Sequence, residues 1–367
     1  MGGKETNDDG RFFDLSFQRS YPACQNVEDM LCQRIFHRFK SGGGNEGIDQ
    51  NGCTRLLEGL LTWPAPTADD GRLAIGQLVS TVYAVFDRDK DGVLDSEEFR
   101  QCFQRWIRTV LFPRWCLLIV DTQNDFIDGS LALRNAPAHQ DGAEIVPVIN
   151  GMLQRHSFDA VVYSMDWHPP NHCSFLHNVT KHTLHPSNKI KAENAKLFDT
   201  VIFSVDGEPM EQVLFPAHCV QGTTGAELHA DLKIVDGANT PSTTVKKATD
   251  ARIDCYSAFE DNLRKHRTML DEFLKQQRIT DVLICGLAYD YCVGRSAMDS
   301  LRFGYRTVII EDAVRGSNDE AIARAKDAFT KEGGLIIAAA QLGDLMSGAC
   351  RSPRLASQTL QNLLNKS

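Results

Sequence analysis

The feature that most constrains the fold is a series of short apolar runs in the second part of the chain. Each run is four or five residues long, and longer mixed segments separate most of the runs. A buried parallel strand has this length and composition, and the intervening segments leave room for crossover helices. The pattern therefore predicts a doubly wound, mainly parallel α/β sheet with helices on both faces. The runs are residues 116–120, 160–163, 282–285, 307–310 and 335–339.

The residues before Phe112 have a different pattern, because their apolar side chains recur at helical spacing. Within this all-α part, residues 87–98 (DRDKDGVLDSEE) fit the EF-hand calcium loop, with Gly92 at its sharp turn. A solvated acidic turn is the weaker alternative. The expected calcium ligands are Asp87, Asp89, Asp91, the carbonyl of Val93, Asp95 and Glu98.

A second, degenerate hand is expected in front of this loop, because a lone EF-hand leaves the apolar faces of its helices exposed. Residues 32–39 would form its first helix, residues 41–52 its loop, and a helix bearing Leu56 and Leu60 would follow. Glycines 42–44 crowd the positions where chelating side chains are needed. We therefore expect an EF-hand pair that binds one calcium ion.

Composition narrows the class of protein. The net charge of −9 argues against a nucleic-acid partner, and no apolar run reaches the ~20 residues of a membrane span. The eleven cysteines are scattered without paired spacing, which suits a reducing compartment, so we expect a cytoplasmic protein, with the nucleus as a further location. Gly2 and Thr6 fit the N-myristoylation template, but acidic residues follow, and an unmodified polar tail is favoured.

Polar residues that follow the apolar runs are the candidate functional residues, because ligands bind at the carboxyl ends of parallel strands. Asp121 follows the first run, and Cys292 lies at the start of an expected helix, where oriented N–H groups lower a thiol pKa. Alone, Cys292 would be interpreted as a buried structural cysteine. Asp166, His168 and His218 combine a carboxylate with two imidazoles, a donor set for a divalent metal with positions left for water or substrate.

Four segments carry a specific resemblance to a known family. They are residues 120–126 (VDTQNDF), 166–172 (DWHPPNH), 216–222 (PAHCVQG) and 289–293 (YDYCV). In this order they resemble the nicotinamidase branch of the isochorismatase-like cysteine hydrolases, over about residues 115–343. The EF-hand part in front resembles the arrangement of certain animal nicotinamidases.

The resemblance implies hydrolysis of nicotinamide to nicotinate and ammonia in NAD salvage, through a thioester on Cys292. Asp121 would take the thiol proton and later deliver it to ammonia, and Lys247 would hold Asp121 and favour the thiolate. The backbone N–H groups of Ala288 and Cys292 would form the oxyanion hole. A cis peptide bond between Leu287 and Ala288 is also implied.

The resemblance further implies that Asp166, His168 and His218 hold the metal, with waters completing the shell. Zinc is favoured, and iron or manganese also suit these ligands. The pyridine nitrogen of nicotinamide would displace one water, which orients the carboxamide towards the thiol. The substrate pocket is expected to contain Phe126, Phe215 and Tyr256.

Three departures from the family pattern matter. Two lysines stand together, and because adjacent side chains of a strand point to opposite faces, only one can reach the site; the spacing to Thr249 favours Lys247 over Lys246. Phe215 stands where a tryptophan is common. A fourth protein ligand is left open: Ser174 is suitably placed, whereas surface positions are favoured for the neighbouring His172 and His177.

The expected division is a flexible tail (1–20), an EF-hand pair (21–112), the hydrolase domain (113–350) and a C-terminal docked helix or tail (351–367). One alternative is a related metal-independent amidase or isochorismatase-type hydrolase, which the metal ligands disfavour. Another is a calcium-sensing adaptor with an inert hydrolase domain, which the intact triad of Asp121, Lys247 and Cys292 disfavours. Nicotinamide is the expected small-molecule partner, and the sequence leaves a homo-oligomer open.

Overall fold

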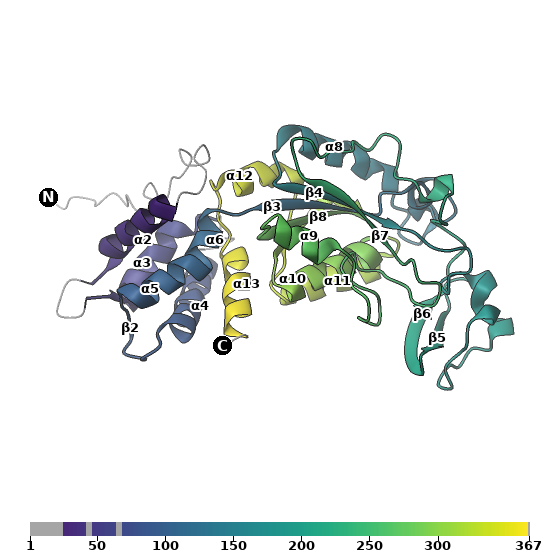
Figure 1. Ribbon diagram of the computed structural model, residues 1–367, viewed down its shortest axis with the longest axis horizontal. Coiled ribbons are helices and arrows are strands. Elements are labelled where there is room, and N and C mark those ends of the chain that lie inside the picture. Colours follow the sequence, from purple (N-terminus) through teal and green to yellow (C-terminus); the bar gives the residue numbers. More distant parts are fainter. Residues whose placement is uncertain (1–24, 42–45, 64–67, 366–367) are drawn as a thin grey trace. The chain divides into compact units, whose positions relative to one another are not determined.

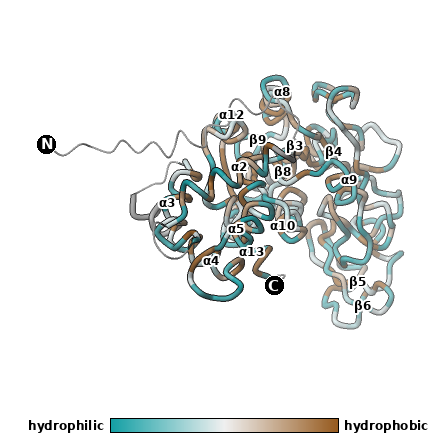
Figure 2. The backbone as a smooth tube through the Cα atoms, turned by 60° about the vertical axis from the view of Figure 1, so that its left-hand side comes forward, coloured by the Kyte–Doolittle hydropathy of each residue, from teal (hydrophilic) through white to brown (hydrophobic). Residues whose placement is uncertain are grey.

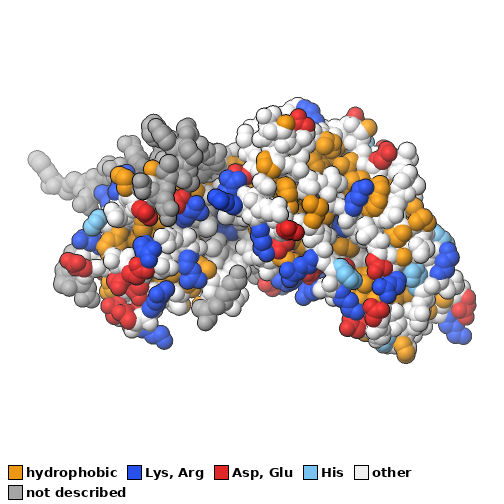
Figure 3. Space-filling model, in the orientation of Figure 1, with side chains coloured by type: hydrophobic (Ala, Val, Ile, Leu, Met, Phe, Trp, Pro, Cys, Tyr) orange, Lys and Arg blue, Asp and Glu red, His pale blue; other side chains and the backbone are white. Residues whose placement is uncertain are grey.

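The computed structural model describes residues 25–41, 46–63 and 68–365. The expected tail, the possible lipidation site at Gly2 and the glycines at 42–44 lie outside these residues. The chain forms two compact units, one of Met1–Pro113 with Ala340–Ser367 and one of Arg114–Ala339 (Figure 1). No helix of the described residues is long and apolar enough to cross a membrane. Acidic and basic side chains are interspersed on the face drawn in Figure 3.

The second unit is built on a six-stranded, fully parallel sheet of order β10-β9-β8-β3-β4-β7. Every residue of β3, β4 and β8 is buried, which explains why these strands form nearly continuous apolar runs (Figure 2). Strand order reverses direction between β3 and β8, so this junction is the topological switch point where such sheets bind ligands. The strands are β3 (Trp115–Val120), β4 (Ala160–Asp166), β7 (Ser242–Lys247), β8 (Asp281–Leu287), β9 (Arg306–Arg315) and β10 (Leu335–Ile337).

Helices cover both faces of the sheet, which confirms the doubly wound α/β fold. Helix α8 (Ile145–Arg155) lies on one face, and α9 (Leu270–Gln276), α10 (Gly294–Phe303) and α11 (Asp319–Lys331) lie on the other (Figure 1). The short α7 (Asn124–Ile127) follows β3. Short 3-10 helices occupy Leu133–Asn135, Gly142–Glu144, Leu176–Lys181, Ala192–Asn194, Thr224–Ala226 and Ala339–Gln341.

The long segment between β4 and β7 contains a hairpin that the sequence analysis did not predict. Strands β5 (Thr200–Val205) and β6 (Glu208–Val213) pair antiparallel, and their inward side chains form a small separate apolar cluster. Asp206 and Gly207 join the strands, both with positive φ (53° and 88°). Asp-Gly is a preferred pair for this kind of two-residue turn, because glycine adopts positive φ without strain.

The first unit contains two helix–loop–helix pairs. One joins α2 (Gln25–Phe39) to α3 (Gln50–Leu60), and the other joins α4 (Ala68–Phe86) to α5 (Ser96–Cys102). The two loops pair through β1 (Ile48–Asp49) and β2 (Val93–Leu94), with Ile48 opposite Leu94. A π-helical turn (Phe103–Ile107) and α6 (Arg108–Leu111) continue α5.

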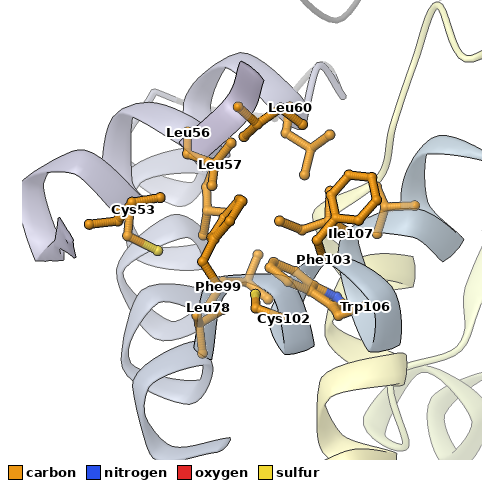
Figure 4. Packing of buried hydrophobic residues seen from close by; sticks show 14 of the residues in the cluster. Cys53, Leu56, Leu57, Leu60, Leu78, Phe99, Cys102, Phe103, Trp106 and Ile107 are labelled. Atoms are coloured by element: carbon orange, nitrogen blue, oxygen red, sulfur yellow. The ribbon is translucent and has the colours of Figure 1, made fainter. Parts of the chain in front are cut away.

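The C-terminal segment is a docked helix rather than a frayed tail. Helices α12 (Leu342–Ser347) and α13 (Pro353–Leu364) belong to the first unit, so the second unit ends earlier than the expected residue 350. Helix α13 begins with Ser352 as N-cap and buries Ala356 and Leu360 in the helical core. Trp106 Nε1 donates a hydrogen bond to the Ala356 carbonyl at 2.9 Å. Figure 4 shows the side chains of this core, which come from several helices.

Candidate active site and metal centre

Four parallel strands bring the candidate residues together at the switch point. Asp121 follows β3, Asp166 ends β4, Lys247 ends β7, and Cys292 follows β8. Asp166 is the register partner of Lys247, so their side chains lie on the same face of neighbouring strands. Gly286 of β8 is required here, because a Cβ would lie 2.0 Å from the carbonyl oxygen of β3 residue Val120.

Lys247 is the centre of the cluster. Its Nζ lies 2.9 Å from Asp121 Oδ2 and 3.4 Å from Cys292 Sγ, donates to the Cys255 carbonyl at 2.8 Å, and also pairs with Asp166. The residue is only 2% exposed. Lys246 is exposed, and its Nζ lies over the Trp167 ring, 3.7 Å from the ring centroid. Lys247 is therefore the lysine that faces the cluster, as strand alternation predicted.

Burial determines the protonation of the cluster. It raises the pKa of Cys292 well above its usual value, an effect that exceeds the opposing attraction of Lys247. The expectation of a thiol pKa lowered by a helix N-terminus is therefore wrong, because desolvation is the larger effect. Burial also raises the pKa of Asp121. Burial alone would lower the pKa of Lys247, but the two aspartates raise it well above its usual value. The thiol thus needs a neighbouring base.

The turn that follows β8 has the expected backbone geometry. The Leu287–Ala288 peptide is cis, and a π-helical turn (Tyr289–Val293) leads into α10. Asp290 fixes this turn to the segment before α11 by accepting hydrogen bonds from the N–H (2.9 Å) and hydroxyl (2.6 Å) of Ser317. Ala288 and Cys292, the expected oxyanion-hole residues, both line the adjoining cavity.

The expected metal ligands converge beside this cluster. Side-chain ligand atoms of Asp166, His168 and His218 lie within 4.8 Å of one another, and all three residues are buried. Neither ring nitrogen of His168 has a hydrogen-bond partner. His218 Nδ1 is bonded to the Pro216 carbonyl at 2.9 Å, so its Nε2 is the nitrogen that could bind a metal. Buried nitrogens without partners are unfavourable unless a ligand satisfies them. The residues present therefore fit a divalent cation.

The pKa of His218, but not that of His168, supports a metal site in the metal-free protein. Burial lowers the pKa of His218 to about 4, so its imidazole is neutral, as a metal ligand must be. Burial would also lower the pKa of His168, but the adjacent Asp166 raises it above its usual value. His168 Nε2 lies 3.5 Å from Asp166 Oδ2.

The candidates for a fourth metal ligand differ clearly in how deeply they are buried. His177 is exposed and stacks on Phe175 at 5.7 Å, as expected for a surface residue. The surface position favoured for His172 is wrong, because this side chain is fully buried. Its Nδ1 is bonded to Ser174 Oγ at 2.7 Å, and its Nε2 has no partner. Ligand atoms of His168, His172 and Asp254 form a second group within 4.8 Å.

Asp254 was not identified from the sequence. It is 3% exposed, and burial raises its carboxyl pKa. An acidic residue between the apolar Ile253 and Cys255, two positions before Tyr256, was the available signal.

A cavity of about 740 Å³ connects these groups to the surface of the unit. It is lined by the expected pocket residues Phe126, Phe215 and Tyr256, as well as by Cys292 and the three metal-ligand candidates. Tyr291 was not predicted; its ring lies 5.6 Å from Phe215 and 5.5 Å from Tyr256. The cavity wall is therefore strongly aromatic around the thiol.

The candidate calcium loop in the first unit is only partly assembled. Ligand oxygens of Asp87, Asp89 and Glu98 lie within 4.8 Å of one another, and Asp87 Oδ1 is buried without a partner. Gly92 has a φ of 83° at the turn. Asp91 instead accepts a hydrogen bond from the N–H of Val93 (2.8 Å), and Asp95 caps α5.

Comparisons with known proteins place the second unit among characterised relatives. Residues 115–341 match the model of the isochorismatase domain. The nicotinamidase of Escherichia coli (strain K12) is 35% identical over 208 residues, which cover 56% of this chain and 85% of that protein. The nicotinamidase of Schizosaccharomyces pombe is 32% identical over 206 residues, which cover 56% of this chain and 84% of that protein.

Solved structures of nicotinamidases are also similar to this chain. A nicotinamidase/pyrazinamidase of Acinetobacter baumanii superposes with a TM-score of 0.52 at 34% identity, covering 62% of this chain and 98% of that one. The yeast nicotinamidase bound to the inhibitor nicotinaldehyde gives a TM-score of 0.51 at 27% identity, covering 61% of this chain and 99% of that one.

Proposed function

The chain belongs to the isochorismatase family, and from this premise we propose that it is an amidohydrolase that converts nicotinamide to nicotinate and ammonia in NAD salvage. One observation carries the proposal: a buried lysine contacts both an aspartate and a cysteine beside a carboxylate–imidazole cluster in one aromatic cavity. The lysine, aspartate and cysteine suit nucleophilic attack on a carbonyl. The carboxylate–imidazole cluster suits a metal that binds the ring nitrogen of a pyridine carboxamide.

The proposed chemistry uses the thiol as nucleophile. Cys292 Sγ attacks the carboxamide carbon while its proton passes to Asp121, and the backbone N–H groups of Ala288 and Cys292 stabilise the oxyanion. The C–N bond breaks as Asp121 returns the proton to the departing ammonia, which leaves a thioester. Water, deprotonated by Asp121, then releases nicotinate and restores the thiol. Lys247 stays protonated throughout and keeps the buried carboxylates paired.

The metal would be held by Asp166, His168 and His218, a set that suits zinc first and iron or manganese as well. When bound, it would supply a Lewis acid that could orient the pyridine nitrogen of the substrate. Phe126, Phe215 and Tyr256 enclose the ring and exclude water from the reacting carboxamide.

Ammonia release from nicotinamide tests the proposal. Cys292→Ala should abolish turnover, whereas Cys350→Ala, a cysteine of the other unit, should leave it unchanged. Both variants should keep the wild-type melting temperature. Benzamide lacks the ring nitrogen and should be a poor substrate of the wild-type enzyme. Substantial turnover by Cys292→Ala, or equal hydrolysis of benzamide and nicotinamide, would contradict the mechanism.

We also propose that the first unit binds one calcium ion at the Asp87–Glu98 loop. The unpartnered Asp87 Oδ1, the buried Glu98 and the β1–β2 pairing of the two loops support this function. Calorimetric titration of the full chain should give one equivalent, which Glu98→Gln should lose. Glu97→Gln is the matched control, because the neighbouring Glu97 pairs with Arg100 on the surface. Binding that survives Glu98→Gln would place the ion elsewhere.

A further inference from the structure

Two members of the buried group of His168, His172 and Asp254, namely His172 and Asp254, have no role in the mechanism above. The three residues are 1%, 0% and 3% exposed, and their ligand atoms lie within 4.8 Å of one another. Only His168 belongs to the proposed metal ligands, so this group meets the metal centre at that imidazole.

The hydrogen bonds of His172 indicate one tautomer. The N–H of Ser174 points at His172 Nδ1 at 3.3 Å, so this nitrogen is an acceptor. The neutral ring must then carry its proton on Nε2. Nε2 is buried without a hydrogen-bond partner, so its N–H is available to the group, with the backbone of Ile253 as the other nearby acceptor.

Asp254 is the acceptor of the group. Its Oδ2 accepts a hydrogen bond from Gln212 Nε2 and its Oδ1 accepts one from the N–H of Cys255, both at 2.8 Å. A carboxylate has about four acceptor positions, so these two bonds leave room for two more donors. The side chains of His168 and His172 each place a nitrogen within 4.8 Å of an Asp254 oxygen, without a hydrogen bond between them in this structure.

The two proposed metal-ligand histidines, His168 and His218, differ in the hydrogen bonds of their ring nitrogens. His218 Nδ1 already contacts the Pro216 carbonyl at 2.9 Å, which orients that ring. His168 has no such bond at either nitrogen. If Nε2, which faces Asp166, binds the metal, Nδ1 carries the proton and needs an acceptor. A metal-bound histidine normally donates this second N–H to a carboxylate or a carbonyl.

We propose that Asp254 is the positioning residue of the metal centre: it accepts the Nδ1–H of His168 and the Nε2–H of His172, and so holds the His168 ring in its metal-binding orientation. The inference rests on the metal site of the proposed function. It adds a carboxylate and a histidine that do not touch the ion but determine how tightly the ion is held.

The test measures metal affinity in the full chain, without the hydrolase assay. After chelator treatment, the Kd for Zn²⁺ is measured by chelator competition, and the visible absorption of bound Co²⁺ reports ligand geometry. Asp254→Asn should weaken Zn²⁺ binding about tenfold to a hundredfold and alter the Co²⁺ spectrum. His172→Gln should change both readouts in the same direction, and it carries the test if Asp254→Asn does not fold.

Two controls match these substitutions. Asp250→Asn makes the same change four residues away, where the side chain lies partly exposed beside Arg252. His177→Gln replaces an exposed histidine of the same loop. Neither should change the Kd or the spectrum.

The outcomes are distinguishable. An unchanged Kd in Asp254→Asn, while Asp166→Ala and His218→Ala lose the metal, would overturn the positioning role and leave the metal site intact. Two Zn²⁺ equivalents in the wild type and one in Asp254→Asn would also overturn it, because the group would then be a second cation site. If Asp166→Ala and His218→Ala bind Zn²⁺ normally, the proposed metal site itself fails.

Discussion

Replacing Lys247 with methionine removes the charge that links the triad to the metal centre, and it keeps most of the side-chain volume. The ammonium is the ion-pair partner of Asp121 and Asp166, whose side chains are buried. Removing one partner of a buried ion pair is destabilising by about 3–5 kcal/mol, since a carboxylate is left uncompensated. The adjacent Lys246→Met is the matched control, because it loses only an exposed cation–π contact worth about 0.5–1 kcal/mol.

The catalytic effect should be larger than the effect on folding. Lys247 Nζ lies 3.4 Å from the Cys292 sulfur and is the group that opposes the rise of the thiol pKa. Without it, the thiolate would form beside two carboxylates that have lost their lysine partner. We expect kcat/KM to fall about 10³-fold or more, which corresponds to about 4 kcal/mol of lost transition-state stabilisation.

Three measurements on both lysine variants check this reasoning. Ammonia release gives kcat/KM, urea unfolding gives the free energy of unfolding, and iodoacetamide labelling of Cys292 gives thiol reactivity. All three should decline in Lys247→Met and stay near wild type in Lys246→Met. If Lys247→Met kept kcat/KM within threefold of wild type while Lys246→Met was inactive, β7 would have the opposite register, and Lys247 would not be the lysine of the site.

Three further predictions concern the metal, pH and calcium. Asp166→Ala and His218→Ala should lose the bound metal and raise KM for nicotinamide strongly; retention of the metal by both variants would exclude them as ligands. In metal-free protein, burial lowers the pKa of His218 from 6.5 to about 4, so between these values only the unfolded chain binds the proton, and stability falls as the pH falls through this window. The contribution is about 3 kcal/mol, and urea unfolding of His218→Asn should show a shallower pH dependence, whereas identical slopes would contradict the assignment. Calcium at a hundredfold excess over Kd should stabilise the first unit by about 2.7 kcal/mol in wild type but not in Glu98→Gln, with little change in kcat/KM; a several-fold change in kcat/KM that Glu98→Gln abolishes would indicate a catalytic switch instead.

The local sequence was sufficient to predict the strands that are buried on both faces, because such strands are continuous apolar runs. Both faces of β3 and β8 are covered, so every residue is apolar or glycine except Asp281, which pairs with Arg306, and the strands are visible as runs. The edge strand β7 has mixed exposure and polar residues, and it appears only as the segment that contains the lysine pair. The β5–β6 hairpin was missed although its alternating buried residues and its Asp-Gly turn were available in the sequence.

The sequence by itself determined the fold class, the family and the chemical types of the site: an aspartate, a lysine, a thiol and a carboxylate with two imidazoles. These follow from local patterns, because each lies next to a strand end and within a specific motif. The pairing of β4 with β7 was not readable, and it alone places Lys247 beside Asp166 and joins the triad to the metal centre. Tertiary structure also decided the burial of His172, the presence of Asp254 and the raised pKa of Cys292. Desolvation and contacts between distant segments depend on what the rest of the chain packs around a side chain, and no local pattern encodes that.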